Sequence, residues 1–483
     1  MKRSKIALAL TVAVSMLSLT ACNDDKDSSS SNQKSSYVSE ANYALDSVNN
    51  TSSIKVMTYN MTNMQGKKAA ATALVLFPNA TQPKDGYRVI VWEHGTVGGG
   101  DDCAPSKNLI HPRFKILAES LLAAGYVIVA PDYEGLGTPG VHPYLNLSSA
   151  ANSALTAVKA AKEHYGKQLS GDWMSIGQSQ GGHASLGTAE FANVDTSYKG
   201  AVAAAPASSL GTIIKIYLDP ALNVDEVTGV SKGVNKLDEQ LLQIRGLVAQ
   251  GQLTSAQEDA YLGQLADGYA ELLAYAALTT SGIKAYEPNY DLKNIFTADA
   301  GVIAEKAYGR TGDDGACLSY PEPNSANGLQ EQFKEGVFEF IKNPNNMISQ
   351  YGIDLNKIDT DPVVQKFLND NQPATNATAA KVIKAPVYII QGAEDKAVIP
   401  VVTQALFANM KAQATKYFPQ ANYAEGYQLD IVPNASHTQA IICRNEQAVD
   451  FIQSKMSAGT GIDLTKAQKD ASTSPHCTGV VPS

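Results

Sequence analysis

The sequence predicts an α/β fold, in which a mostly parallel sheet carries helices on both faces and a large helical cap is inserted into the chain. Short, wholly apolar strand-like runs alternate with helix-like runs over residues 89–206, the pattern of strands buried on both faces of a parallel sheet. The alternation stops within residues 208–380 and resumes within residues 381–457. Polar residues follow several of the apolar runs, where such sheets place their reactive groups.

The composition narrows the possible partners. The chain has 483 residues, of which 44% are hydrophobic, and a formal net charge of −9 without a long basic run after the N-terminus. We expect no nucleic-acid partner, because neutralising phosphates requires clustered Lys and Arg. The cysteine spacings match no zinc pattern, and we expect neither a metal site nor a cofactor.

The N-terminus has the layout of a secretory signal. Residues 1–5 are basic, residues 6–19 are mostly apolar, and the run LTAC ends at Cys22. The apolar run is too short for a membrane span. Together with LTAC it resembles a bacterial lipoprotein signal. Cleavage of such a signal would leave Cys22 as the new, lipid-modified N-terminus. A plain signal peptide with an incidental cysteine is the alternative. We therefore expect a lipid anchor in the bacterial cell envelope, at the outer membrane by analogy with enteric bacteria because Asn23 follows the cysteine.

The elements of the first core part, residues 51–207, follow in order after an expected flexible tether at residues 23–50. Two strands separated by a polar turn are expected at residues 54–59 and 72–77. Apolar strands are expected at residues 89–92, 126–130, 172–176 and 199–205, with helices at residues 112–124, 147–165 and 182–191.

The inserted segment, residues 208–380, shows helical spacing and no clear strand. Leu237, Leu241, Ile244 and Val248 fall on one helical face. We interpret such stripes as packing between helices, and the alternative is that some line an acyl pocket. The second core part, residues 381–457, is expected to hold strands at 385–390 and 427–432 and helices at 401–411 and 438–456, before a C-terminal tail at 458–483.

A serine turn lies at the centre of the predicted core. The run GQSQG at residues 177–181 fits the pattern G-x-S-x-G, with an apolar strand before it and a helix after it. In this pattern a tight turn lifts a serine from the end of a strand, and glycines flank it because side chains there would collide with the neighbouring backbone. We expect Ser179 to be a nucleophile; an ordinary turn with a buried serine is the alternative.

A serine needs a base and an acid that orients it, and around such turns the chain order is serine, acid, histidine. His437 directly follows the last expected strand, whereas its rival His476 lies in the tail. Asp395 follows the strand at 385–390 and is preferred over its neighbour Glu394. We expect His94 to shape a loop rather than to act as the base.

The tetrahedral oxyanion needs hydrogen-bond donors. One is expected from the backbone N–H of Gln180, directly after the nucleophile. Another is expected from the loop at Gly95 and Thr96, which follows an apolar strand. The Thr96 hydroxyl is a candidate for a third donor.

The cysteines predict two disulfides. If Cys22 carries the lipid, an even number remains in an exported protein, and four cysteines allow three connectivities. The remaining cysteines are Cys103, Cys317, Cys443 and Cys477.

Four runs together resemble the secretory lipase family, which includes the yeast lipase A type. They are HGT at 94–96 with DCAPS at 102–106; DYEGLGTPG at 132–140 with HPY at 142–144; GQSQGGH at 177–183; and QGAED at 391–395 with His437. The resemblance spans roughly residues 55–457. It implies an α/β-hydrolase core, a helical cap and esterase or lipase activity.

The resemblance places the family's catalytic triad on Ser179, Asp395 and His437. It also implies that Cys103 pairs with Cys317, which leaves Cys443 with Cys477. The lipoprotein signal, the tether and the sequence of the cap depart from the yeast members.

These observations predict a serine carboxylic ester hydrolase of the cell envelope that acts through an acyl-enzyme on acyl esters or glycerides. Its partners would be a small-molecule or lipid ester and, through the lipid anchor, the membrane. One alternative is a peptidase or amidase with the same triad. Another is a non-catalytic binding protein with a hydrolase fold.

Overall fold

The computed structural model describes residues 35–169, 171–225, 227–321, 323–374, 378–456 and 474–480. The predicted signal region with Cys22, and residues 23–34 of the predicted tether, lie outside these residues. No helix of the described part is long and apolar enough to cross a membrane.

A nine-stranded sheet forms the core of the described residues, in the order β1-β2-β3-β5-β4-β6-β7-β8-β9. The first strands, β1 to β3, pair antiparallel, and β3 pairs antiparallel with β5. All later pairs are parallel. The strands are β1 Tyr37–Asn42, β2 Thr51–Thr62, β3 Lys68–Pro78, β4 Val89–Glu93, β5 Val127–Pro131, β6 Trp173–Gln178, β7 Tyr198–Ala204, β8 Val387–Gly392 and β9 Tyr427–Val432.

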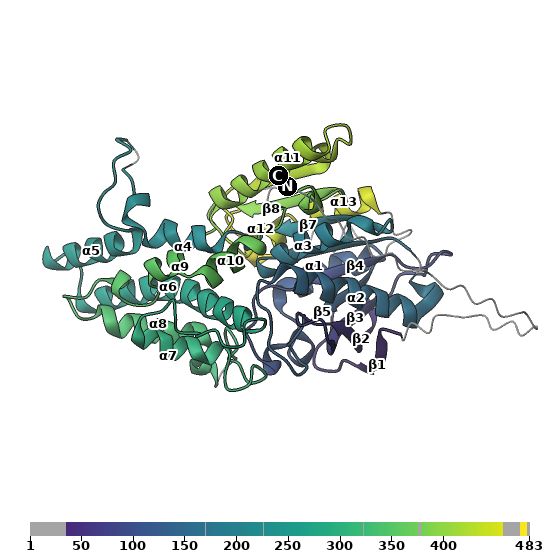
Figure 1. Cartoon of the computed structure of the whole chain (residues 1–483), viewed down its shortest axis with the longest axis horizontal. Coiled ribbons are helices and arrows are strands. Elements are labelled where there is room, and N and C mark those ends of the chain that lie inside the picture. Colours follow the sequence, from purple (N-terminus) through teal and green to yellow (C-terminus); the bar gives the residue numbers. More distant parts are fainter. Residues whose placement is uncertain are drawn as a thin grey trace, which may run out of the picture. The chain divides into compact units, whose positions relative to one another are not determined.

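Helices cover both faces of this sheet, as the apolar strands predict. Because side chains alternate along a strand, Ile90 of β4 packs with α1 and α13, whereas Val91 packs with α2, α3 and α11. The core helices are α1 Pro112–Ala123, α2 Leu147–Tyr165, α3 Gln180–Phe191, α11 Pro400–Tyr417, α12 Gln439–Cys443 and α13 Asn445–Lys455 (Figure 1). The predicted fold class is confirmed.

The structure corrects two expectations at the ends of the core. Residues 37–42, expected within the tether, form β1, because the outer edge of β2 offers it a full set of backbone partners. The single helix expected at residues 438–456 is two helices, since Arg444 leaves the helical conformation at φ −112° and ψ 25°. Its guanidinium donates to Asp430 at 2.9 Å.

The inserted segment is helical, and its described residues contain isolated bridges but no strand. Figure 1 shows its longer helices gathered beside the sheet. They are α4 Leu210–Leu218, α5 Lys236–Ala249, α6 Ser255–Lys284, α7 Ala298–Ala304, α8 Leu329–Ile341, α9 Leu355–Thr360 and α10 Pro362–Asp370.

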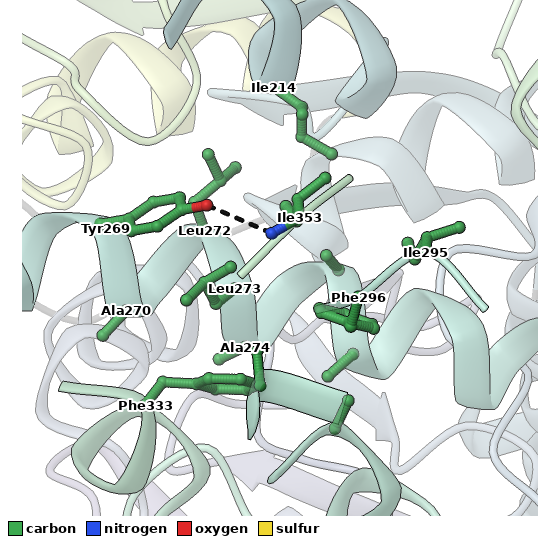
Figure 2. Close-up of a cluster of buried hydrophobic side chains, with 14 of the residues drawn as sticks. Ile214, Tyr269, Ala270, Leu272, Leu273, Ala274, Ile295, Phe296, Phe333 and Ile353 are labelled. Atoms are coloured by element: carbon green, nitrogen blue, oxygen red, sulfur yellow. Dashed lines mark hydrogen bonds between the residues drawn. The ribbon is translucent and has the colours of Figure 1, made fainter. Parts of the chain in front are cut away.

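The long helix α6 is the centre of the cap. Its start is stabilised by a capping box between Thr254 and Gln257. Figure 2 shows its middle packed among apolar side chains, and Tyr269 accepts a hydrogen bond from the backbone N–H of Ile353 at 3.3 Å. The rings of Phe296 and Phe333 lie 6.3 Å apart in the same cluster. Packing between helices therefore accounts for most of the apolar stripes in this segment.

Candidate active site

Ser179 stands at the sharp turn between β6 and α3. Its backbone has φ +63°, a conformation that non-glycine residues rarely adopt and that is found at functional turns. A Cβ at Gly177 would lie 2.2 Å from the carbonyl oxygen of Gly181, and one at Gly181 would lie 1.8 Å from that of Glu93. Both flanking glycines are therefore required by close backbone contact, as the sequence pattern indicated.

Asp395 and His437 are brought together from the ends of β8 and β9. The carboxylate of Asp395 lies 2.7 Å from Nδ1 of His437 and accepts further hydrogen bonds from the backbone N–H groups of Ala397 and Val398. An ionised carboxylate only accepts, so Nδ1 carries the proton and Nε2 is the acceptor. Glu394 is exposed and takes no part in this contact.

The free nitrogen of His437 lies at the same cavity as the serine. Within the described residues Nε2 is buried and has no hydrogen-bond partner. Ser179 and His437 both line a cavity of about 280 Å³. Nε2 of His437 therefore makes no hydrogen bond to Ser179 in this structure, and in serine hydrolases this bond is often long without substrate.

The other histidines considered from the sequence lie in different settings. The ring nitrogens of His94 face two backbone carbonyls, those of Gly95 at 2.7 Å and Asp132 at 3.1 Å. Burial lowers its pKa. His94 therefore holds the loop in place. His476 is exposed in the tail.

The predicted oxyanion donors lie on both sides of the serine. A Cβ at Gly95 would be 3.8 Å from Cβ of Ser179, so this loop closely approaches that serine. Gln180 is the first residue of α3, and its N–H therefore has no acceptor within the helix. The hydroxyl of Thr96 lies 2.8 Å from that of Tyr144.

The run HPY at residues 142–144 holds the side chains of Gln180 and Thr96 in place, a role that the sequence alone did not reveal. Nδ1 of His142 donates to the carbonyl of Glu134 at 2.9 Å, and its Nε2 accepts from the side-chain amide of Gln180 at 3.1 Å. Burial lowers the pKa of His142 to about 4, so the ring is neutral. Through these contacts His142 holds Gln180 and Tyr144 holds Thr96. The only sequence signal was the run itself.

The cap is tied to the oxyanion loop. The structure contains the disulfides Cys103–Cys317 and Cys443–Cys477, with sequence separations of 214 and 34. Beside the first, the backbone of residues 97–101 bonds with that of residues 313–318, for example Leu318 N–H to the carbonyl of Val97 at 2.8 Å. Cβ atoms at Gly98 and Gly100 would clash with this strip, and one at Gly99 would lie 2.1 Å from the carbonyl oxygen of Ala307, which accounts for the three glycines.

Tyr275 of α6 borders three cavities, two of which are also lined by Ser179. The cavity of about 280 Å³ contains Ser179, His437 and Glu271. A second cavity, of about 20 Å³, also touches Ser179 and is lined mainly by apolar residues. A third, of about 350 Å³, is lined by cap residues that include Tyr275 and by Lys396 and Ala397 of the core. The described residues contain no cluster of His, Cys, Asp or Glu suited to a metal ion.

The comparisons agree with this fold. No protein-family model and no curated protein matches the sequence. Among solved structures, Candida antarctica lipase A in its closed state is similar, with a TM-score of 0.54 and 16% identity over 92% of this chain and 85% of that chain. The rice cell wall degrading esterase LipA from Xanthomonas oryzae has a TM-score of 0.53 and 16% identity over 83% of this chain and 90% of that chain. The chain thus has the fold of lipase A-type α/β-hydrolases.

Proposed function

We propose that this protein is a serine carboxylic ester hydrolase that acts through an acyl-enzyme. The observation that carries the proposal is the contact of Asp395 with Nδ1 of His437, a residue that lines the same cavity as Ser179 and whose Nε2 has no hydrogen-bond partner among the described residues. The names of the similar structures, a lipase and an esterase, favour acyl esters or glycerides as the substrate class.

The reaction follows from these roles. Nε2 of His437 takes the proton of Ser179 as the hydroxyl attacks the ester carbonyl. The backbone N–H of Gln180 and the loop at Gly95 and Thr96 donate to the developing oxyanion. His437 then returns the proton to the leaving alcohol, and an acyl-enzyme remains. Water, deprotonated by the same histidine, then attacks the acyl carbonyl; the bond to Ser179 breaks, the acid leaves, and His437 returns the proton to the serine.

The test is labelling combined with turnover. A fluorophosphonate should label Ser179, and Ser179→Ala should remove both labelling and hydrolysis of nitrophenyl acetate and butyrate. Loss of one triad member usually lowers the rate by several orders of magnitude. An amidase would instead release nitroaniline from aminoacyl anilides, and a binding protein would release neither product. Labelling at another residue, with Ser179→Ala still active, would contradict the assignment.

We also propose that the mature protein is anchored to the cell envelope through lipidated Cys22. This rests on the N-terminal sequence alone. One fatty chain anchors only weakly, so stable retention requires the multiple chains of a processed lipoprotein. Wild type should partition with membranes and Cys22→Ser should not; soluble wild type with an unmodified N-terminus would overturn the proposal.

A further inference from the structure

Among the described residues, one arginine lines the cavity that Ser179 and His437 share. Arg113, near the start of α1, borders the space of about 280 Å³ that Ser179 and His437 share. Its guanidinium donates to Oε1 of Gln178, the residue before the nucleophile, and lies near Nε2 of His111, both at 3.4 Å. Both contacts are long and neither partner is charged, since burial lowers the pKa of His111 to about 4.

The charge of Arg113 has no close counter-ion within the described residues. None of their ion pairs within 4 Å includes it. Glu271 of α6 lines the same cavity and acts on Arg113 only at longer range, and its Oε1 already accepts from Tyr275 at 2.6 Å. Burial lowers the pKa of Arg113. A partly desolvated cation of this kind gains most from an anion that arrives with the substrate.

The position of His437 shows which part of an ester would meet this cation. His437 must protonate the leaving alcohol, so the alcohol part lies on its side of Ser179. His437 lines the larger cavity, together with Arg113, and is not among the residues around the small one. The small cavity is lined by apolar side chains such as Leu210 and Ile213, which suits an acyl group.

We propose that Arg113 binds an anionic group, a carboxylate or a phosphate, on the alcohol part of the ester substrate. The inference rests on the proposed function and narrows its substrate class. The planar guanidinium can give two parallel hydrogen bonds to either oxyanion. Arg113 is thus a specificity residue, because it contacts the alcohol part and takes no share in the bond changes.

A structural role for Arg113 makes a different prediction. Arg113 donates to Gln178, and the amide of Gln178 donates to the backbone carbonyl of His437 at 3.1 Å. If Arg113 acted only by positioning this chain, its replacement would slow every ester alike. If Arg113 instead binds an anionic group of the substrate, its replacement would change the ratio of kcat/KM for a charged ester to kcat/KM for an uncharged one.

The experiment uses three aryl acetates with ring substituents of different charge, and the reaction followed is release of acetate. They are 3-acetoxybenzoate, its uncharged methyl ester and 3-acetoxyphenyl phosphate, and the readout is kcat/KM of each anionic ester divided by that of the neutral one. Arg113→Gln should lower the ratio for at least one anion by about tenfold or more. Lys115→Gln is the matched control, because it removes the same charge from the same helix where Lys115 pairs with Asp46 outside the cavity. It should keep the wild-type ratio.

The three esters also identify the anion. If the subsite binds a carboxylate, Arg113→Gln should lose the preference for 3-acetoxybenzoate. If it binds a phosphate, the variant should lose the preference for 3-acetoxyphenyl phosphate. Unchanged ratios for both anions in Arg113→Gln would overturn the proposal. So would an equal loss on all three esters, which would leave Arg113 as a positioning residue.

A binding measurement separates this inference from the proposed function. Calorimetry with 3-hydroxybenzoate and 3-hydroxyphenyl phosphate, the released alcohols, is carried out on Ser179→Ala with and without Arg113→Gln. If the calorimetry shows binding that requires Arg113 but the wild-type protein hydrolyses no ester, the result would support the anion subsite and contradict the hydrolase. Hydrolysis of neutral esters with no Arg113-dependent binding or preference would support the hydrolase and contradict the subsite. Failure of both measurements would contradict both.

Discussion

At the scale of single residues, one carboxyl group behind the serine turn is in an unusual state. Glu93 ends β4 and is fully buried, and its Oε1 accepts a hydrogen bond from Thr188 at 2.6 Å. Burial raises its pKa from the ordinary value of 4.5 to about 8. Glu93 is therefore protonated near neutral pH, and its ionisation would introduce an unpaired charge beside the turn.

This state predicts a pH dependence of stability. Between about pH 4.5 and pH 8 the folded state holds a proton that the unfolded state has released, so the free energy of unfolding falls as the pH rises through this window. Glu93→Gln keeps an acceptor for Thr188 and removes the titration. The melting temperature of Glu93→Gln minus that of wild type should therefore increase as the pH is raised from 5 to 8. The exposed Glu425→Gln is the control, and an equal pH profile for Glu93→Gln and wild type would contradict the assignment.

The orienting acid gives a second prediction at this scale. Asp395→Asn should keep the fold but lower kcat by roughly 10⁴, because the amide no longer holds the productive tautomer of His437. The exposed neighbour provides the control, and Glu394→Gln should stay near wild type. Ester turnover and circular dichroism check both variants. An active Asp395→Asn together with an inactive Glu394→Gln would mean that Glu394, and not Asp395, is the orienting acid.

The sequence could predict where Ser179, Asp395 and His437 lie, because each follows its own strand in a local pattern. It could not predict the role of Arg113, which depends on how α1 packs against the end of β6. Nor could it predict the protonation of Glu93, because the raised pKa arises from burial among strands and helices distant in the chain.

At the scale of elements, the oxyanion loop and the HPY run form one unit. The hydroxyls of Thr96 and Tyr144 are 2.8 Å apart, so the Thr96 side chain is held in one orientation beside the nucleophile. If its hydroxyl donates to the oxyanion, Thr96→Val should lower kcat by roughly 10²-fold with little change in KM. Thr96→Ser keeps the hydroxyl and should retain most of the rate. Full activity of Thr96→Val would mean that backbone N–H groups act alone.

The sequence predicted the buried strands because they are short apolar runs, and β9 Tyr427–Val432 has the bounds expected. Two elements were missed for physical reasons. The strand β1 is a polar edge strand held by pairing with β2, so it lacks an apolar signature. The break at Arg444 lies within a sequence pattern that suits one continuous helix, at the residue whose guanidinium bonds to Asp430 of β9.

At the scale of the whole described molecule, the cap and the core jointly enclose the site. Tyr275 of α6 borders all three cavities, and Cys103–Cys317 joins the oxyanion side of the core to the cap. The pairing could be expected only from family resemblance, since counting cysteines leaves three connectivities. The cavities could not be predicted, because they depend on how helices of the insertion pack over the strand ends.

The tie between cap and core gives the last prediction. The bond closes 214 residues, and loop-closure entropy would stabilise the folded state by roughly 5 kcal/mol, against about 4 kcal/mol for the 34-residue loop of Cys443–Cys477. Replacing both Cys103 and Cys317 by Ser should therefore lower the melting temperature. It should also reduce turnover of long acyl esters more than of acetates, because cap side chains such as Leu210, Ile213 and Tyr275 form part of the wall of the small cavity of about 20 Å³ that we assign to the acyl group.

The same change at the other disulfide is the control for this prediction. Replacing Cys443 and Cys477 by Ser removes a bond between α12 and the tail, neither of which lines the small cavity. That variant should lose stability without a change in the preference for acyl chain length. Nitrophenyl esters from acetate to laurate, measured well below each melting temperature, separate the two effects. Equal losses on short and long esters in the variant without Cys103–Cys317 would mean that the cap takes no part in holding the acyl group.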